Sequence, residues 1–129
     1  MQCLNSSQSL AWFNLFEPIS KKERERALFC SRLLSHSLKS ESFREQIFGD
    51  VYLSLDEVDL ALSSYNRAFT ALLQENNVYG LLVITNKIVN LKQPCKNYIE
   101  SANSKIDKKN RSHMLFFNEI IKKEKSLTI

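Results

Sequence analysis

The residues with chemically active side chains are scattered along the chain rather than grouped. The two histidines, His36 and His113, stand alone, with only serine or methionine beside them. The cysteines Cys3, Cys30 and Cys95 form no CxxC pair and no Cys/His cluster of the kind that binds zinc. No Ser/His/Asp order and no glycine-rich phosphate loop occurs either. The sequence therefore predicts no catalytic residue, no metal site and no cofactor.

The densest group of carboxylates, Asp56, Glu57 and Asp59, stands at the start of a run with the apolar period of a helix. Negative charge at a helix N-terminus offsets the partial positive charge of the backbone there. This structural role explains the carboxylates without catalysis. We expect that the protein is not an enzyme.

The composition indicates a single helical domain. Of 129 residues, 43% are hydrophobic and 25% charged, an ordinary globular balance. Only 2 Gly and 2 Pro are present, too few for an all-β fold with many tight turns. We find no apolar run of about 18 residues, so we expect no membrane span. The polar residues 1–10 do not resemble a signal peptide, and three separated cysteines suit a reducing compartment, so we expect a cytoplasmic protein.

A repeat with a spacing of 33 or 34 residues runs through the chain. Its clearest copy, residues 42–75, carries small and aromatic residues at helical spacing: Gly49, Tyr52, Ala61, Tyr65 and Ala68. Small residues let two antiparallel helices approach closely, and the aromatic residues fill the space that is left. This pattern resembles the tetratricopeptide repeat (TPR), although Glu45 and Leu73 stand where that family often has Trp and Pro.

Weaker copies flank the clear one. Tyr79 takes the Trp place of the copy at residues 76–109, and Cys95, Ile99 and Ala102 repeat its Ala, aromatic, Ala spacing. Trp12 opens an atypical copy at residues 9–41. Three Ser-x-x-Glu sequences predict helix starts as capping boxes: Ser20 to Glu23, Ser42 to Glu45 and Ser54 to Glu57.

The resemblance covers nearly the whole chain and implies an all-α fold. We expect a right-handed TPR-like solenoid of about three helix-turn-helix units with seven helices, forming one domain over residues 1–129. Its units would span residues 9–41, 42–75 and 76–109, and a capping helix would span residues 110–127.

In TPR proteins the first helices of the units line a concave groove that binds peptides or partner helices. Helical periodicity selects the residues that would line this groove here: Phe13, Asn14, Phe43, Ile47, Asp50, Leu53, Leu81, Ile84, Lys87 and Ile88. The same period is typical of core residues, so groove and core stay open for Ile47, Leu81, Ile84 and Ile88. Gly80, inside a predicted helix, either allows close approach of a ligand or is a tolerated defect.

Charge divides the chain. Residues 1–75 carry 8 Lys or Arg and 10 Asp or Glu, whereas residues 76–129 carry 10 and 4. The basic half is either a solvated surface or a site for an acidic partner or nucleic acid. Aromatic residues are not interleaved with Lys105, Lys108, Lys109 and Arg111, so nucleic-acid binding is disfavoured.

These observations favour a protein or peptide partner. The size and the apolar groove are similar to those of type III secretion chaperones, which implies a small chaperone or adaptor that holds an apolar segment of a secretion substrate or subunit. The alternative is a scaffold subunit of a larger TPR assembly, or a homodimer through Trp12 and Phe13. Solution mass discriminates between these two hypotheses.

Overall fold

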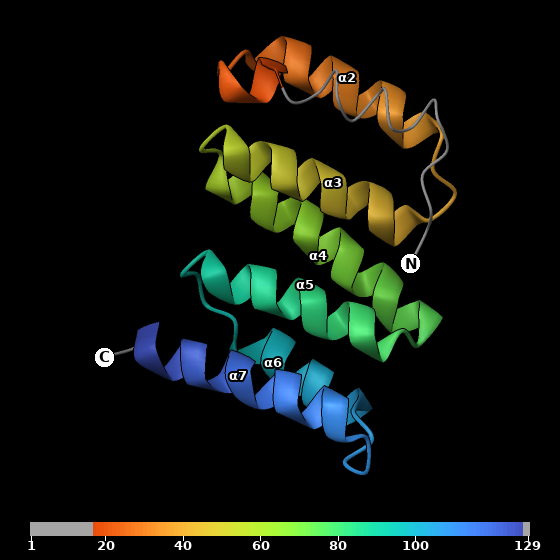
Figure 1. Cartoon of the computed structure of the whole chain (residues 1–129), viewed down its shortest axis with the longest axis vertical. Helices are drawn as coiled ribbons and strands as arrows, with labels where there is room; N and C mark the ends of the chain where they lie inside the picture. The colour runs from red at the N-terminus through yellow and green to blue at the C-terminus, as the bar shows by residue number, and fades with distance from the viewer. Residues whose placement is uncertain (1–16, 128–129) are drawn as a thin grey trace. The chain divides into compact units, whose positions relative to one another are not determined.

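The computed structural model describes residues 17–127, and every regular element within them is helical. A helical turn at residues 17–20 precedes six helices (Figure 1): α2 Arg24–His36, α3 Glu41–Ser54, α4 Val58–Glu75, α5 Val78–Asn90, α6 Lys96–Lys105 and α7 Arg111–Leu127. The predicted all-α class is therefore confirmed for this part of the chain. None of the helices described here combines the length and the apolarity needed to cross a bilayer.

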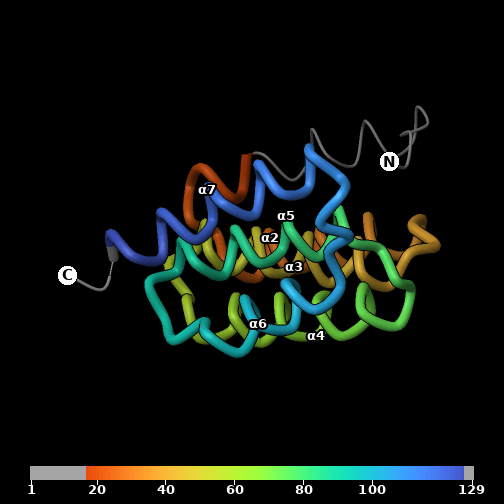
Figure 2. Tube along the Cα trace, turned by 90° about the horizontal axis from the view of Figure 1, so that it is seen from below, coloured from red at the N-terminus to blue at the C-terminus, as the bar shows by residue number. Residues whose placement is uncertain are grey.

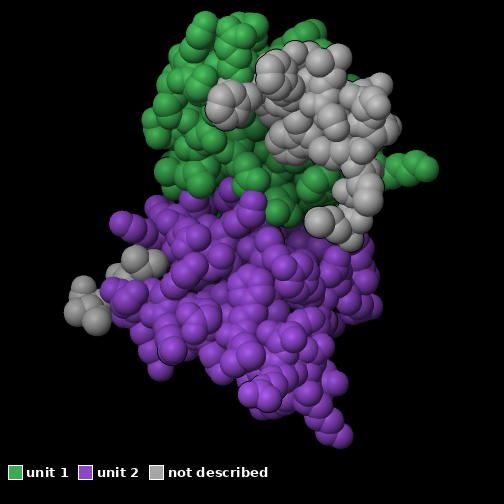
Figure 3. Space-filling view, viewed as in Figure 1, with its two compact units in different colours: residues 1–64 green, residues 65–129 purple. Residues whose placement is uncertain are grey.

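The chain forms two compact units, which Figure 3 colours separately. Unit 1 is Met1–Ser64 and unit 2 is Tyr65–Ile129. The division falls inside α4, so it does not follow the repeat limits that the sequence predicts. Each unit is described on its own below.

Unit 1 is built on the antiparallel pair α2 and α3 (Figure 1). One face of α2 repeats apolar or small residues at helical spacing, and these residues meet the buried side chains of α3. The core consists of Ala27, Leu28, Leu34, Leu38, Ile47 and Val51. Ser31 also lies in this buried face, where its hydroxyl donates a hydrogen bond to the carbonyl oxygen of Ala27 at 2.7 Å. The polar group is therefore satisfied without breaking the apolar packing.

Unit 2 is centred on α5, which contacts both α6 and α7 (Figure 2). The colours in Figure 1 show that α6 runs antiparallel to α5, whereas α7 runs in the same direction as α5. On α5 the residues Leu81, Leu82, Ile84, Ile88 and Val89 are buried, which makes it the most thoroughly packed helix of the unit.

An aromatic contact joins the second part of α4 to α6. The rings of Phe69 and Tyr98 meet edge to face, with centroids 5.0 Å apart. The Tyr98 hydroxyl also donates a hydrogen bond to Oδ1 of Asn66 at 2.9 Å. This ring and its hydroxyl therefore fix the position of α6 within unit 2.

Most residues that carry the repeat resemblance lie inside the protein. Ala61, Tyr65, Ala68 and Ala102 are at most 1% exposed. Two others belong to α3: Gly49 is buried, and Tyr52 packs half-buried against the core of unit 1. Trp12 lies outside the described residues.

The helix starts differ from the predicted capping boxes. The hydroxyl of Ser40, rather than that of Ser42, accepts a hydrogen bond from the backbone N–H of Phe43 at 3.2 Å and caps α3. Ser20 and Ser54 do not open helices either, because their hydroxyls donate to carbonyl oxygens of the preceding turn. The three predicted boxes are therefore wrong, even though each lies within a few residues of a real helix end.

Candidate protein-binding surfaces

In unit 1 the residues predicted to line a groove have unequal exposure. Ile47 is 2% exposed and belongs to the core, and Phe43 packs partly against that core. Asp50 is half-buried and Leu53 is 38% exposed. The predicted groove residues Phe13 and Asn14 lie outside the described residues.

In unit 2 the predicted groove residues of α5 are interior. Leu81, Ile84 and Ile88 have no exposed area. Lys87 is half-buried, and its Nζ lies 6.0 Å from the centroid of the Tyr65 ring, a cation–π distance. A partner could reach the three apolar side chains only after the surrounding packing opened.

These positions correct the interpretation of Ile47, Leu81, Ile84 and Ile88 as an open lining. Their apolar period marks a helix face that avoids water, and packed helices of the same chain satisfy that requirement as well as a partner does. The surface available to a partner must therefore be sought elsewhere.

Unit 2 carries different exposed apolar side chains: Tyr79 of α5 contacts Phe116 of α7, and Leu115 precedes Phe116 on α7. Tyr79 is 61% exposed, Leu115 is 58% exposed and Phe116 is half-buried. The rings of Tyr79 and Phe116 meet edge to face, with centroids 6.1 Å apart and planes at 68°. We name Tyr79, Leu115 and Phe116 the aromatic patch.

Capped helix starts hold the aromatic patch in place. Oδ1 of Asn77 accepts a hydrogen bond from the backbone N–H of Gly80 at 2.9 Å and fixes the first turn of α5, which carries Tyr79. Oδ1 of Asn110 accepts from the backbone N–H of His113 at 3.1 Å and fixes the first turn of α7. An Asn at the N-cap satisfies backbone donors that the helix leaves free. The patch is therefore preorganised by local hydrogen bonds.

A second exposed apolar pair lies on α2 of unit 1. Phe29 is 57% exposed and Leu33 is 55% exposed. Residues four apart share one face of a helix, so these two side chains form a short apolar stripe. We name Phe29 and Leu33 the α2 stripe.

A basic connection links α6 to α7. It contains Lys105, Lys108, Lys109 and Arg111, all exposed, and we name these four residues the basic loop. Asp107 shapes the connection, because its carboxylate accepts a hydrogen bond from the backbone N–H of Lys109 at 2.9 Å and its carbonyl oxygen accepts from that of Asn110 at 2.9 Å. Lys108 and Lys109 therefore stand on a hydrogen-bonded turn, between Lys105 at the end of α6 and Arg111 at the start of α7.

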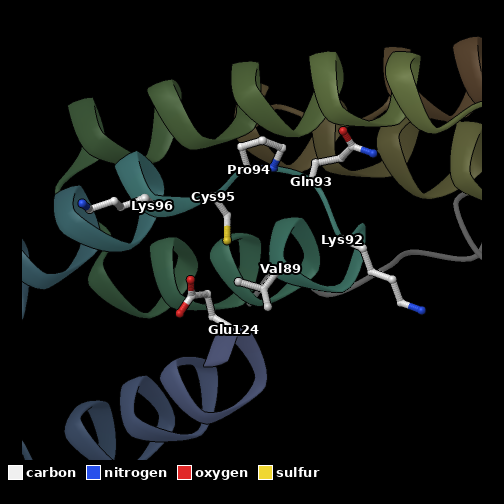
Figure 4. Close-up of a pocket in the computed structure, with 7 residues that line it drawn as sticks. All are labelled: Val89, Lys92, Gln93, Pro94, Cys95, Lys96 and Glu124. Atoms are coloured by element: carbon white, nitrogen blue, oxygen red, sulfur yellow. The ribbon is translucent and has the colours of Figure 1, made fainter. Parts of the chain in front are cut away.

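A cavity of about 350 Å³ opens between the end of α5, the start of α6 and α7 (Figure 4). Its lining includes Lys92, Pro94, Cys95 and Glu124, and the Cys95 sulfur points toward Glu124. Burial raises the pKa of the Cys95 thiol, and the negative charge of Glu124 raises it further. The thiol is therefore held in its protonated form, the opposite of what an activated nucleophile requires.

Clusters of three or more metal-ligating side chains do not occur among residues 17–127. The sequence prediction placed Tyr79 in a repeat position that packs, and it did not foresee that this ring would be largely exposed beside Phe116. The signal available in the sequence was the position of Tyr79 next to a helix start, where a large side chain has fewer neighbours.

No protein-family model, curated protein or solved structure matches this chain. Its function is therefore argued from its own geometry.

Proposed function

We propose that this chain is a non-enzymatic protein-binding module that holds an apolar helix or an extended apolar segment of a partner. The observation that carries the proposal is the aromatic patch, where Tyr79 of α5 and Leu115 of α7 are both more than half exposed. Such a surface loses unfavourable contact with water when a partner covers it. The free energy of binding becomes more favourable by roughly 25 cal/mol for each Å² of apolar surface buried.

The chemistry of the patch suits recognition of a polypeptide. Tyr is enriched among the residues that dominate protein interfaces, because it offers a large rigid apolar ring and a polar hydroxyl. The Tyr79 ring already rests on Phe116, so little side-chain freedom is lost when a partner binds. An amphipathic helix could place one or two apolar side chains against these three residues.

The proposal includes a TPR-like architecture, with a right-handed solenoid and a chaperone or adaptor role in the cytoplasm. Three facts support it: every regular element within residues 17–127 is helical, the sequence repeats at a spacing of 33 or 34 residues, and Ala61, Ala68 and Ala102 are buried where close helix packing needs small residues. Type III secretion substrates or subunits are the class of client that the resemblance suggests.

The α2 stripe favours a second role, as a scaffold subunit or homodimer. A helix face with two exposed apolar residues four apart can pack against a helix of another chain. The solution mass of the purified protein separates the roles, since a stable monomer favours a module that awaits its client.

The proposal is tested by co-purification from native lysate with two matched double variants. Tyr79→Ser with Leu115→Ser removes the two most exposed side chains of the aromatic patch, and Phe29→Ser with Leu33→Ser removes the α2 stripe, whose exposure is similar. Circular dichroism first establishes that both variants are folded, as expected for exposed positions.

We expect one polypeptide to co-purify with the wild type and with the α2-stripe variant but not with the aromatic-patch variant. Equal recovery with all three proteins would show that the aromatic patch is not the binding surface. If the polypeptide failed to co-purify with the α2-stripe variant alone, the binding surface would lie on unit 1 instead.

A further inference from the structure

Carboxylates pair with the cations that lie just before and at the start of α2, but not with those of the basic loop, among the residues that the structure describes. In unit 1, four cations are neutralised by carboxylates at ion-pair distance: Lys21 with Glu17 at 3.0 Å, Lys22 with Asp56 at 3.1 Å, Arg24 with Glu57 at 2.9 Å and Arg26 with Glu23 at 3.1 Å. In unit 2, none of the four cations of the basic loop forms an ion pair with a described residue. Within residues 17–127, the basic loop therefore carries four cations without an ion pair and one carboxylate, that of Asp107, which accepts the backbone N–H of Lys109.

The position of the basic loop makes this charge unfavourable for the isolated protein. Lys108, Lys109 and Arg111 surround the start of α7, where the helix itself carries partial positive charge, and the first turn of α7 contains no acidic residue. Acidic side chains are the usual choice at such a place. A bound carboxylate would relieve both the repulsion among the cations and that between the cations and the helix end.

The basic loop precedes the α7 residues of the aromatic patch directly in sequence. Arg111 and Leu115 are four residues apart, so they share one face of α7. Phe116 follows Arg111 by five residues, which is about 7.5 Å along the helix axis. One short segment of a partner can therefore reach the cations and the apolar residues at the same time.

We propose that the segment recognised by unit 2 is an acidic polypeptide with an aromatic or aliphatic anchor: the anchor covers the aromatic patch, and the carboxylates on one side of it face the basic loop. This inference rests on the proposed function and names the chemistry of the partner at that same surface. Complementary charge accelerates encounter and selects among partners, while the anchor supplies most of the affinity.

A polypeptide fits this surface better than a nucleic acid does. Bases stack on exposed aromatic faces that alternate with cations along a groove. Here Phe116 is half-buried and its ring is in edge contact with Tyr79, so the patch does not offer successive stacking faces.

The test is selection from a random dodecapeptide display library on the purified full-length protein at low salt. We expect the enriched peptides to combine an excess of Asp and Glu with an aromatic residue or Leu. Lys108→Glu with Lys109→Glu reverses charge in the basic loop. Lys92→Glu with Lys96→Glu is the matched control, because it changes the net charge equally at exposed positions before and at the start of α6.

The strongest peptide should bind the basic-loop variant at least about tenfold more weakly than the wild type, and binding to the control variant should change by less than about twofold. Equal losses with both lysine variants would show attraction by net charge alone and would overturn the inference. A single-stranded oligonucleotide of equal charge that bound more tightly than this peptide would overturn it in favour of nucleic acid.

The selection also separates this inference from the proposed function. The enriched peptides could instead be apolar without an excess of Asp and Glu, and fail to bind the variant with Tyr79→Ser and Leu115→Ser. That result would overturn the inference of an acidic partner but would still support the protein-binding role. No enrichment on the wild type would contradict both.

Discussion

Ile47 and Leu53 lie on the same helix, α3, but in different environments. Ile47 is 2% exposed in the core of unit 1, whereas Leu53 is 38% exposed. The sequence predicts both as groove residues. The effect of each side chain on the free energy of unfolding therefore shows which of the two belongs to the core.

We predict that Ile47→Ala lowers the free energy of unfolding by about 2–5 kcal/mol, because it removes buried methyl groups and leaves a cavity. Leu53→Ala should lower it by no more than about 1 kcal/mol, as expected for a position with little burial to lose. Urea denaturation followed by circular dichroism measures both. Equal effects of the two substitutions would contradict the placement of Ile47 in the core.

Two ionisable groups of unit 2, the Cys95 thiol and the Tyr98 hydroxyl, are stabilised in their protonated forms. Burial is the main reason that the pKa values of the Cys95 thiol and the Tyr98 hydroxyl are both raised. A raised pKa in the folded state means that the unfolded chain loses these protons first as pH increases. Stability is therefore unaffected below the unfolded pKa values and falls as pH rises through and beyond them.

We predict that the free energy of unfolding falls in the alkaline range, starting near the ordinary pKa values of roughly 8.5 for a thiol and 10 for a phenol. Cys95→Ala with Tyr98→Phe should show a smaller fall over the same range, although its stability at neutral pH is lower. Chemical denaturation at a series of pH values gives the comparison. Parallel pH profiles for the two proteins would show that these groups do not titrate differently on unfolding.

At the scale of elements, Gly80 in the first turn of α5 has a packing role. A Cβ at this position would lie 2.6 Å from Cδ2 of Leu72 on α4 and 3.0 Å from Cγ of Asn77, the N-cap residue. The absence of a side chain therefore lets α4 approach the start of α5. This explains a glycine that the sequence left open as either a ligand contact or a tolerated defect.

We predict that Gly80→Ala fails to stabilise the protein, although Ala is favoured over Gly inside a helix by about 1 kcal/mol. The cost of overpacking, about 1–3 kcal/mol, cancels or exceeds that gain. In a Leu72→Val background, which lacks the clashing Cδ2 atom, the same substitution should be less destabilising or stabilising. Thermal unfolding of the four proteins completes the cycle, and a Gly80→Ala variant more stable than the wild type would refute the packing role.

The sequence predicted the elements better than their ends. The apolar period of the clear repeat placed two helices within residues 42–75, where α3 and α4 lie, because that period is a property of each helix alone. At α3 the predicted capping residue was wrong because more than one serine stands near the start of the helix. Ser42 is drawn into the buried face of α3, and Ser40 two residues earlier takes the cap.

The candidate site could be predicted only in part, for a similar reason. Periodicity identifies the apolar face of α5, but which face is covered depends on helices distant in sequence. Ile84 is covered and Tyr79 is not. The basic loop was visible in the sequence, since a cluster of charges is local, but its nearness to the aromatic patch needed the packing of α5 against α7.

At the scale of the molecule, charge follows the division into two units. Residues 1–64 carry 7 Lys or Arg and 9 Asp or Glu, whereas residues 65–129 carry 11 and 5. The unit with the basic surface is the one that bears the aromatic patch. We therefore expect the proposed partner to bind unit 2, with an affinity that weakens as salt screens the charges.

The central claim is that the aromatic patch and the adjoining basic loop are the surface that binds a polypeptide. Hydrogen–deuterium exchange of the full-length protein, free and saturated with the strongest selected peptide, tests this claim most directly. If the peptide covers the aromatic patch and the basic loop, amides in residues 78–82 and 108–117 will exchange more slowly in the bound state. Protection confined to α2, or to residues 89–96 around the Cys95 cavity, would contradict it.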